Sequence, residues 1–107
     1  MKIITTAELH QILATQPSVP LIDVRTPAEF AEVHIPQARS VPLDELNPGA
    51  LQFPKDQPVY LVCRTDRRSA MAAEHFASAG YTQPVVVVGG TLAWVRANLP
   101  VTRGDQG

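Results

Sequence analysis

Three apolar runs along the chain are typical of strands that are buried on both faces. They occupy residues 20–24, 59–62 and 85–88, and each is too short for a buried helix. Between these runs, apolar residues recur at the spacing of a helix. The pattern is clearest over residues 69–79, directly before Gly80, a typical residue at a helix end. Apolar strands that alternate with helices predict a mostly parallel central sheet with helices on both faces.

Two capping boxes mark helix starts in the first third of the chain. In each, a threonine is followed three residues later by a glutamate, so each side chain can bond the other's backbone N–H. Thr5 and Glu8 predict a helix through Ala14, and Thr26 and Glu29 predict a second. The remaining expected elements are short strands at 3–4 and 38–41, a helical turn at 43–46, and a last helix over 91–97 that carries Trp94.

Composition and charge fit one ordinary globular domain, which we expect to span residues 1–107. The chain is 45% hydrophobic and 18% charged, with a formal net charge of −1. This balance gives no reason to expect binding to nucleic acid or to an acidic membrane. The single cysteine cannot form an internal disulfide, and the N-terminus lacks the apolar core of a signal peptide. We therefore expect a cytoplasmic protein.

The chemistry concentrates at the only cysteine, Cys63, which directly follows a buried strand. In parallel sheets, ligands bind at the carboxyl ends of the strands. The segment from Arg64 to Arg68 holds three arginines and leads into a helix. Its backbone N–H groups, the helix start and the guanidinium groups all favour a thiolate over a thiol. A lone cysteine after an apolar strand is more often an inert core residue, but an inert cysteine gains nothing from surrounding cations.

Three segments, in order, resemble the signatures of the rhodanese family, and together they cover nearly the whole chain. They are Leu21 to Arg25 with Glu29-Phe30 and His34 to Ala38; the loop from Cys63 to Ser69; and Gly89-Gly90 with Trp94 and Leu99 to Val101. The resemblance implies a rhodanese-like three-layer α/β fold. It also implies a sulfurtransferase that works through a persulfide and needs no cofactor.

By position, the resemblance makes Cys63 the nucleophile and sulfur carrier. It assigns the cradle of the persulfide to the next five residues, Arg64, Thr65, Asp66, Arg67 and Arg68. Arg68 matches the arginine that closes the family's loop, while Arg64 and Arg67 are candidates for attracting an anionic donor. The implied donor is thiosulfate or a similar anion. The implied acceptors are cyanide or a thiol such as thioredoxin or glutathione.

Two positions, Asp66 in the loop and Gln37 in a turn, depart from the family pattern, which often has glycine at both. Aspartate tolerates a left-handed backbone better than most residues, so Asp66 can take the glycine's conformation. Its carboxylate also brings a negative charge close to the thiolate. We therefore predict weaker donor binding, or a less acidic thiol, than in a relative with glycine. Gln37 bears on the local backbone more than on the chemistry.

The other titratable residues fit structural roles. The histidines, His10, His34 and His75, are widely separated and lack the spacing of metal ligands. Asp23 and Arg25 flank the end of a buried strand, and Glu29 is explained by helix capping. The spacing of Arg25 and Glu29 allows an ion pair between them.

The length of the loop after Cys63 argues against two other classes of cysteine-dependent enzyme. Cysteine-dependent phosphatases and arsenate reductases resemble this arrangement, but their arginine lies six positions after the cysteine, where this chain has Ser69. Arg68 falls one place early, and a shorter ring of donors suits one sulfur atom better than a tetrahedral phosphate. Two readings stay open within the resemblance: a protein-to-protein sulfur relay, and a non-catalytic rhodanese-like binding module.

Overall fold

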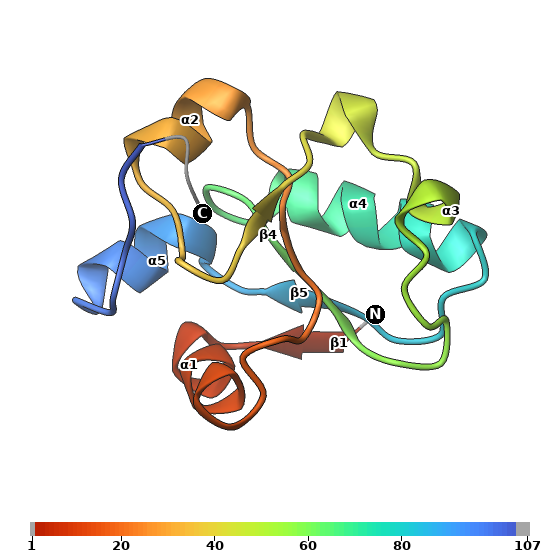
Figure 1. Ribbon diagram of the computed structural model, residues 1–107, viewed down its shortest axis with the longest axis horizontal. Helices are drawn as coiled ribbons and strands as arrows, with labels where there is room; N and C mark the ends of the chain where they lie inside the picture. The colour runs from red at the N-terminus through yellow and green to blue at the C-terminus, as the bar shows by residue number, and fades with distance from the viewer. Residues whose placement is uncertain (1, 105–107) are drawn as a thin grey trace.

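The structure is a computed structural model that describes residues 2–104 (Figure 1). Along the chain, the elements are β1 (Lys2–Ile4), α1 (Thr6–Thr15), β2 (Leu21–Asp23), α2 (Pro27–Glu32), β3 (Arg39–Ser40), the 3-10 helix η1 (Leu43–Glu45), α3 (Pro48–Leu51), β4 (Val59–Val62), α4 (Arg67–Ser78), β5 (Pro84–Val87) and α5 (Gly90–Arg96).

Within the described residues, five strands form one sheet in the order β1-β5-β4-β2-β3. Every strand pairing is parallel, which confirms the predicted fold class. The central strand is β4, so its carboxyl end lies between those of β5 and β2. Cys63 follows β4 directly and therefore stands at the middle of this edge of the sheet.

Helices cover both faces of the sheet, as predicted. On one face, α1, α2 and α5 contribute the buried side chains Leu9, Leu13, Phe30 and Trp94. On the other face, α4 contributes Ala72, Ala73 and Phe76. Side chains of β4 alternate between the two cores, with Val62 on the first face and Leu61 on the second. Cys63 continues this alternation and lies on the α4 face.

Both predicted capping boxes are present. At α1, the Thr5 hydroxyl accepts the Glu8 N–H at 3.1 Å, and the Glu8 carboxylate accepts the Thr5 N–H at 2.9 Å. At α2, the corresponding distances between Thr26 and Glu29 are 3.2 Å and 3.0 Å. The second box sets the start of α2 close to the end of β2 and fixes the position of Glu29.

Two features differ from the sequence prediction. Helix α4 begins at Arg67 instead of Ser69, so the last two residues of the expected loop form part of its first turn. The short helix α3 was not predicted; it starts at Pro48 and ends where Gln52 adopts a left-handed φ of 58°. A four-residue helix shows too little periodicity to be recognised from its pattern.

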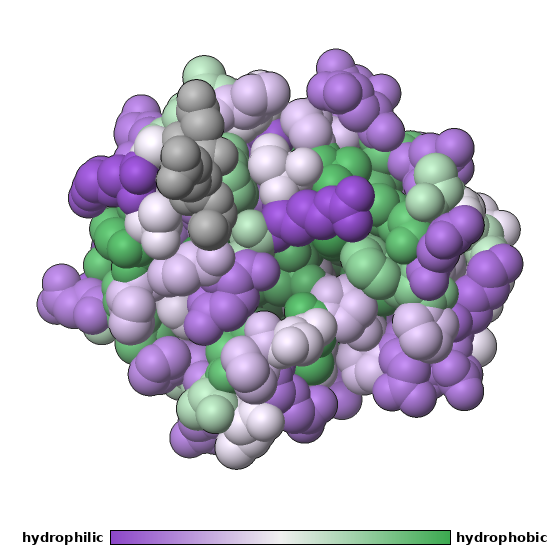
Figure 2. Space-filling model, viewed as in Figure 1, coloured by the Kyte–Doolittle hydropathy of each residue, from purple (hydrophilic) through white to green (hydrophobic). Residues whose placement is uncertain are grey.

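The surface in the orientation of Figure 1 is largely hydrophilic, with hydrophobic atoms gathered near the centre and toward the segment that carries η1 and α3 (Figure 2). In that segment, partly buried Val41, Leu43, Leu46, Leu51 and Phe53 pack against the core on the α4 side. Among residues 2–104, no helix is both long and apolar enough to cross a membrane.

Candidate active site

The Cys63 sulfur lies at the start of helix α4. The Ser69 N–H donates to Sγ at 3.4 Å, and the thiol donates to the Ser69 hydroxyl oxygen at 3.4 Å. That hydroxyl in turn donates to the Asp66 carbonyl oxygen at 2.9 Å. Cys63 is 1% exposed, so its environment is the interior of the loop and the α4 face of the core. A negative charge on this sulfur would face the positive end of the helix dipole.

Ser69 is a residue of this site that the sequence analysis did not assign, although it ends the family-like loop. Its N–H is the third of α4 and belongs to the first four of a helix, which have no partner within the helix. Because α4 starts at Arg67, Ser69 lies in its first turn, and this free N–H points to the Cys63 sulfur. The sequence pattern placed the helix start at Ser69, two residues too late, so it did not indicate this contact.

The first turn of α5 holds the active-site loop by its carbonyl groups. The Thr91 N–H donates to the Cys63 carbonyl at 2.8 Å, and the Leu92 N–H donates to the Arg64 carbonyl at 3.2 Å. Gly90 lies so close that an added Cβ would collide with the Cys63 and Thr65 carbonyl oxygens. In a trans peptide, the N–H points opposite to the carbonyl, so the loop's N–H groups next to these carbonyls point away from α5.

Asp66 is oriented toward the β5–α5 turn. Its carboxylate oxygen accepts the Gly89 N–H at 2.7 Å. Its φ is −142°, so the expected left-handed conformation is not adopted; the positive φ values lie instead at Gly89 and Gly90, in the facing turn. Gln37 is likewise accommodated without a positive φ. Neither departure from the family pattern places a left-handed backbone on a residue other than glycine.

Arg68 pairs with Glu29 across the site. Two guanidinium nitrogens donate to the two carboxylate oxygens at 2.6 Å and 3.0 Å. The Arg68 hydrogen bond, helped by the Thr26 cap, lowers the pKa of Glu29 from 4.5 to about 2. The pKa of Arg68 is raised, first by the Glu29 hydrogen bond and further by the charges of Glu29, Cys63 and Asp23. This pair ties α2 to the first turn of α4.

Arg25 has a different partner from the one that its spacing suggested. Its guanidinium pairs with Asp23 at 2.7 Å, and both side chains are buried. It also donates to the Val33 carbonyl at 2.7 Å. The expected pair between Arg25 and Glu29 is therefore wrong, because Glu29 turns to Arg68. Asp23 and Arg25 join the end of β2 to the end of α2, which is a structural role.

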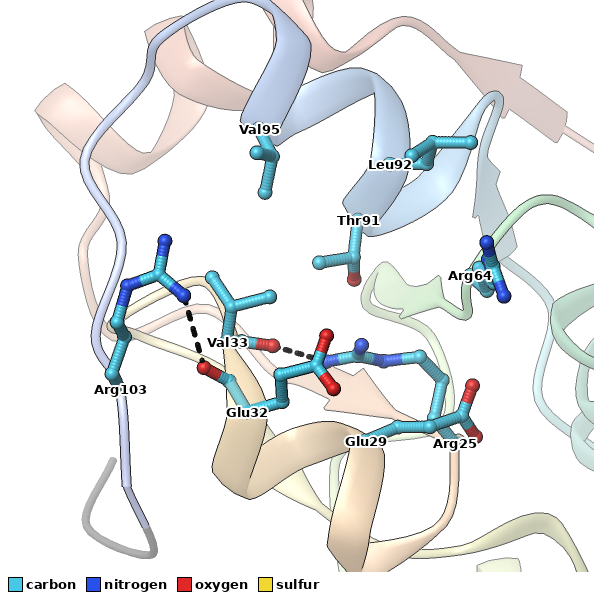
Figure 3. Close-up of a pocket in the computed structure, with 9 residues that line it drawn as sticks. All are labelled: Arg25, Glu29, Glu32, Val33, Arg64, Thr91, Leu92, Val95 and Arg103. Carbon is cyan, nitrogen blue, oxygen red and sulfur yellow. Dashed lines mark hydrogen bonds between the residues drawn. The ribbon is translucent and has the colours of Figure 1, made fainter.

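The other assigned loop residues, Arg64, Thr65 and Arg67, are exposed. Among the described residues, none of the three makes a side-chain hydrogen bond. Arg64 lines a pocket of about 360 Å³ between α2 and α5, which we call the α2–α5 pocket (Figure 3). Its other lining residues include Glu32, Val33, Thr91, Val95 and Arg103.

The histidines lie away from the sulfur contacts. His10 and His75 are exposed. His34 is buried, with Nδ1 2.7 Å from the Phe30 carbonyl oxygen and its ring stacked on Phe30. Within residues 2–104, no group of three or more histidine, cysteine or acidic side chains is arranged to hold a metal ion.

Comparison with known proteins identifies the family. The model of the rhodanese-like domain matches residues 5–97. This chain belongs to the rhodanese-like family. A sulfurtransferase from Allochromatium vinosum is 37% identical over 98 residues, which is 92% of each chain. A rhodanese-like domain protein from Staphylococcus aureus has a crystal structure with 38% identity and a TM-score of 0.79, covering 88% of this chain and 91% of that one.

Some relatives of this rhodanese-like domain are much longer proteins. The chain spans 52% of an uncharacterized protein from Synechocystis, at 40% identity. It spans 25% of a probable adenylyltransferase/sulfurtransferase from Mycobacterium tuberculosis, at 36% identity. The family and these names support sulfurtransferase activity in general terms.

Proposed function

We propose that this rhodanese-like domain is a sulfurtransferase that carries sulfane sulfur as a persulfide on Cys63. One observation carries the proposal: Sγ lies at the start of α4 and accepts the Ser69 N–H at 3.4 Å. A helix start and a backbone donor stabilise a sulfur anion, whether it is a thiolate or the outer sulfur of a persulfide. An inert core cysteine has no need of either.

In the loading step, the Cys63 thiolate attacks the outer sulfur of thiosulfate. A sulfur–sulfur bond forms to Sγ, and the bond between the two sulfurs of thiosulfate breaks. Sulfite leaves with that electron pair, and the negative charge remains on the outer sulfur of the new persulfide. The exposed guanidinium groups of Arg64 and Arg67 favour the approach of this doubly charged donor.

In the unloading step, an acceptor attacks the outer sulfur of the persulfide. A thiolate or cyanide forms a bond to that sulfur, and the bond to Sγ breaks. The electron pair returns to Cys63 as a thiolate, which the Ser69 N–H stabilises again. The Ser69 hydroxyl accepts from the thiol and can rotate to donate to the thiolate, so one side chain serves both states.

The loop contributes through its backbone. Because α5 bonds the Cys63 and Arg64 carbonyls, the adjoining N–H groups are held on the other side of the loop, available to an anion. Arg68 closes the loop while Glu29 holds its guanidinium in place. Since Cys63 is 1% exposed, a donor reaches Sγ only when the loop shifts.

Intact-mass measurement after incubation with thiosulfate tests this proposal. The reduced protein should gain one sulfur atom, and cyanide should remove it with formation of thiocyanate. Cys63→Ser should gain nothing under the same conditions. Absence of any adduct on a protein whose thiol is shown to be reduced would contradict the proposal.

A protein acceptor is the second candidate, because several relatives are named for sulfur transfer or carriage within longer chains. One is the adenylyltransferase/sulfurtransferase from Mycobacterium tuberculosis, and another is a putative sulfur carrier protein from Bacillus subtilis at 32% identity. The loaded protein should then transfer sulfur to reduced thioredoxin faster than to glutathione or cyanide at equal concentration. Faster transfer to the small acceptors would favour the first candidate.

A further inference from the structure

The α2–α5 pocket lies apart from the Cys63 sulfur and has no part in the chemistry described above. Cys63 packs on the α4 face of the sheet and is not among the residues that line the pocket. The pocket's volume of about 360 Å³ lies within the range of roughly 300–1,000 Å³ that is usual for small-molecule sites. An occupant of this pocket is therefore neither the sulfur donor nor the sulfur acceptor.

Thr91 brings an unpartnered hydroxyl group to the pocket. Thr91 is 2% exposed, and its hydroxyl has no hydrogen-bond partner among residues 2–104. Figure 3 shows this hydroxyl pointing from α5 into the pocket. Buried hydroxyl groups almost always have a partner, so this one points to a polar group that enters the pocket.

Arg25 brings a second unpartnered donor to the same space. Its Nε and Nη2 donate to the Asp23 carboxylate, and Nη2 also donates to the Val33 carbonyl. Among the described residues, no hydrogen bond involves Nη1, although Arg25 is only 4% exposed. In Figure 3, the guanidinium faces the Thr91 hydroxyl across the pocket. Because arginine can only donate, the group that both side chains bind is a hydrogen-bond acceptor.

The charge around the pocket favours an anionic acceptor. Arg25 and Glu29 each belong to an ion pair that compensates their charge. The other charged residues of the lining are Arg64, Arg103 and Glu32, which together leave one net positive charge. Arg64 and Arg103 stand on opposite sides of the pocket, so they supply a positive field instead of a direct clamp (Figure 3).

Apolar side chains form the rest of the lining. Val33, Leu92 and Val95 surround the same space as the two donors (Figure 3). An inorganic anion would leave these side chains against water, whereas a hydrocarbon group covers them and gains the free energy of apolar burial. The lining therefore fits an anion that is attached to a small apolar body.

We propose that the α2–α5 pocket binds a small organic carboxylate. Its carboxylate accepts from the Thr91 hydroxyl and from Nη1 of Arg25, and its hydrocarbon part packs against the three apolar side chains. The Thr91 N–H donates to the Cys63 carbonyl at 2.8 Å, so a ligand held by Thr91 also secures α5 against the active-site loop. Binding itself does not depend on the proposed function, because the ligand does not react with the sulfur.

NMR titration of the ¹⁵N-labelled protein with four probes tests the class of ligand. Benzoate carries a carboxylate on an apolar ring. Benzamide lacks the charge, benzylamine reverses it, and acetate lacks the ring. Benzoate should bind more tightly than the other three and should shift the amide signal of Thr91. Equal affinity for all four probes, or an unmoved Thr91 signal, would overturn the proposal and leave the pocket to water.

Variants of Thr91 and Glu32 locate the carboxylate. Thr91→Val should weaken benzoate binding about tenfold, the lower end for a hydrogen bond to a charged group, and Thr91→Ser should restore it. Glu32→Gln should tighten binding about 2–5-fold, because it removes an exposed negative charge from the lining. A gain in affinity does not come from poor folding, so this variant keeps the test valid even if Thr91→Val fails to fold.

Glu45→Gln is the matched control for Glu32→Gln. It makes the same change of charge at an exposed residue of η1 that does not line the pocket. It should bind benzoate like the parent. Equal affinity in Glu32→Gln and Glu45→Gln, or full affinity in a folded Thr91→Val, would overturn the assigned position of the carboxylate.

Amide hydrogen exchange tests the link to the active-site loop. The N–H groups of Thr91 and Leu92 bond two carbonyl groups of that loop. Saturating benzoate should slow the exchange of both N–H groups more than the exchange of those in α1. Equal slowing throughout the protein would overturn this link, because the ligand would then stabilise the fold without acting on the loop.

Discussion

The Asp66 carboxylate accepts the Gly89 N–H at 2.7 Å, so the backbone of the β5–α5 turn compensates part of its charge. Ser69, three residues further on, gives its N–H to the Cys63 sulfur. These two residues lie in one short segment yet act differently. Ser69 donates its backbone N–H to the sulfur, and Asp66 holds the loop against α5 while adding a negative charge near the site.

Asp66→Asn separates the charge of this residue from its hydrogen bond. Asparagine keeps an oxygen for the Gly89 N–H but removes the negative charge that repels thiosulfate. The KM for thiosulfate should fall about 2–5-fold, the range for one partly exposed charge. Steady-state kinetics with cyanide as acceptor measure this, and high salt should reduce the difference.

Asp66→Gly is the companion variant. It should show the same change in KM and also lose about 0.5–1.5 kcal/mol of stability, because the Gly89 N–H loses its partner. Unchanged KM for thiosulfate in both variants would show that the Asp66 charge does not reach the donor.

Between elements, the active-site loop is held from two sides. Helix α2 reaches it through the Glu29–Arg68 pair, and α5 reaches it through N–H groups bonded to the Cys63 and Arg64 carbonyls. Besides pairing with Arg68, the Glu29 carboxylate accepts the Thr26 N–H and so caps its own helix. A change at either contact should therefore alter stability and sulfur loading together.

The Glu29–Arg68 pair predicts a specific loss of stability in acid. Since folding lowers the pKa of Glu29 from 4.5 to about 2, its charge stabilises the fold above pH 4.5. This contribution is lost as the pH falls from 4.5 through 2. The two side chains are 32% and 30% exposed, so solvent screening limits the contribution to about 1–2 kcal/mol.

Urea unfolding of Glu29→Gln measures this contribution. The variant should be less stable than the parent by that amount near neutral pH, and the difference should vanish as the pH approaches 2. Glu8→Gln is the control, since Glu8 caps α1 through Thr5 without an ion pair to another helix. An equal loss in both variants would mean that capping, and not the pair with Arg68, carries the effect.

Gly90→Ala tests the contact between α5 and the loop. The new methyl group would meet the Cys63 and Thr65 carbonyl oxygens, and the φ of 58° would add backbone strain. We expect a loss of more than about 2 kcal/mol of stability together with slower loading by thiosulfate. Gly104→Ala is the control, because Gly104 has a positive φ but, among residues 2–104, no atom outside its immediate neighbours lies within 4 Å of an added Cβ. Equal effects of the two changes would refute a close approach at Gly90.

At the scale of the whole molecule, a buried ion pair joins the sheet to the helical layer that carries Glu29. Asp23 is 0% exposed and Arg25 is 4% exposed, and Arg25 also bonds the Val33 carbonyl at the end of α2. Removing one charge leaves the other buried without compensation. The fold as a whole, and not only the site, depends on this pair.

Asp23→Ala should lower the free energy of unfolding by about 3–5 kcal/mol, because Arg25 stays buried and unpaired. The double variant Asp23→Ala, Arg25→Met should recover part of this loss, since apolar groups tolerate burial better than a single charge. Urea unfolding of both variants gives the comparison. A double variant less stable than Asp23→Ala would contradict this account of the pair.

The sequence by itself determined most of the elements, the parallel sheet and the place of Cys63 directly after a buried strand. Capping boxes and apolar runs act over a few neighbouring residues, so they can be read without knowing the rest of the fold. Only the tertiary structure decided the partners: Glu29 with Arg68, Asp66 with Gly89, and the turn of α5 against the loop. The first two pairs are 39 and 23 residues apart, and the order of the strands, which no local pattern encodes, brings them together.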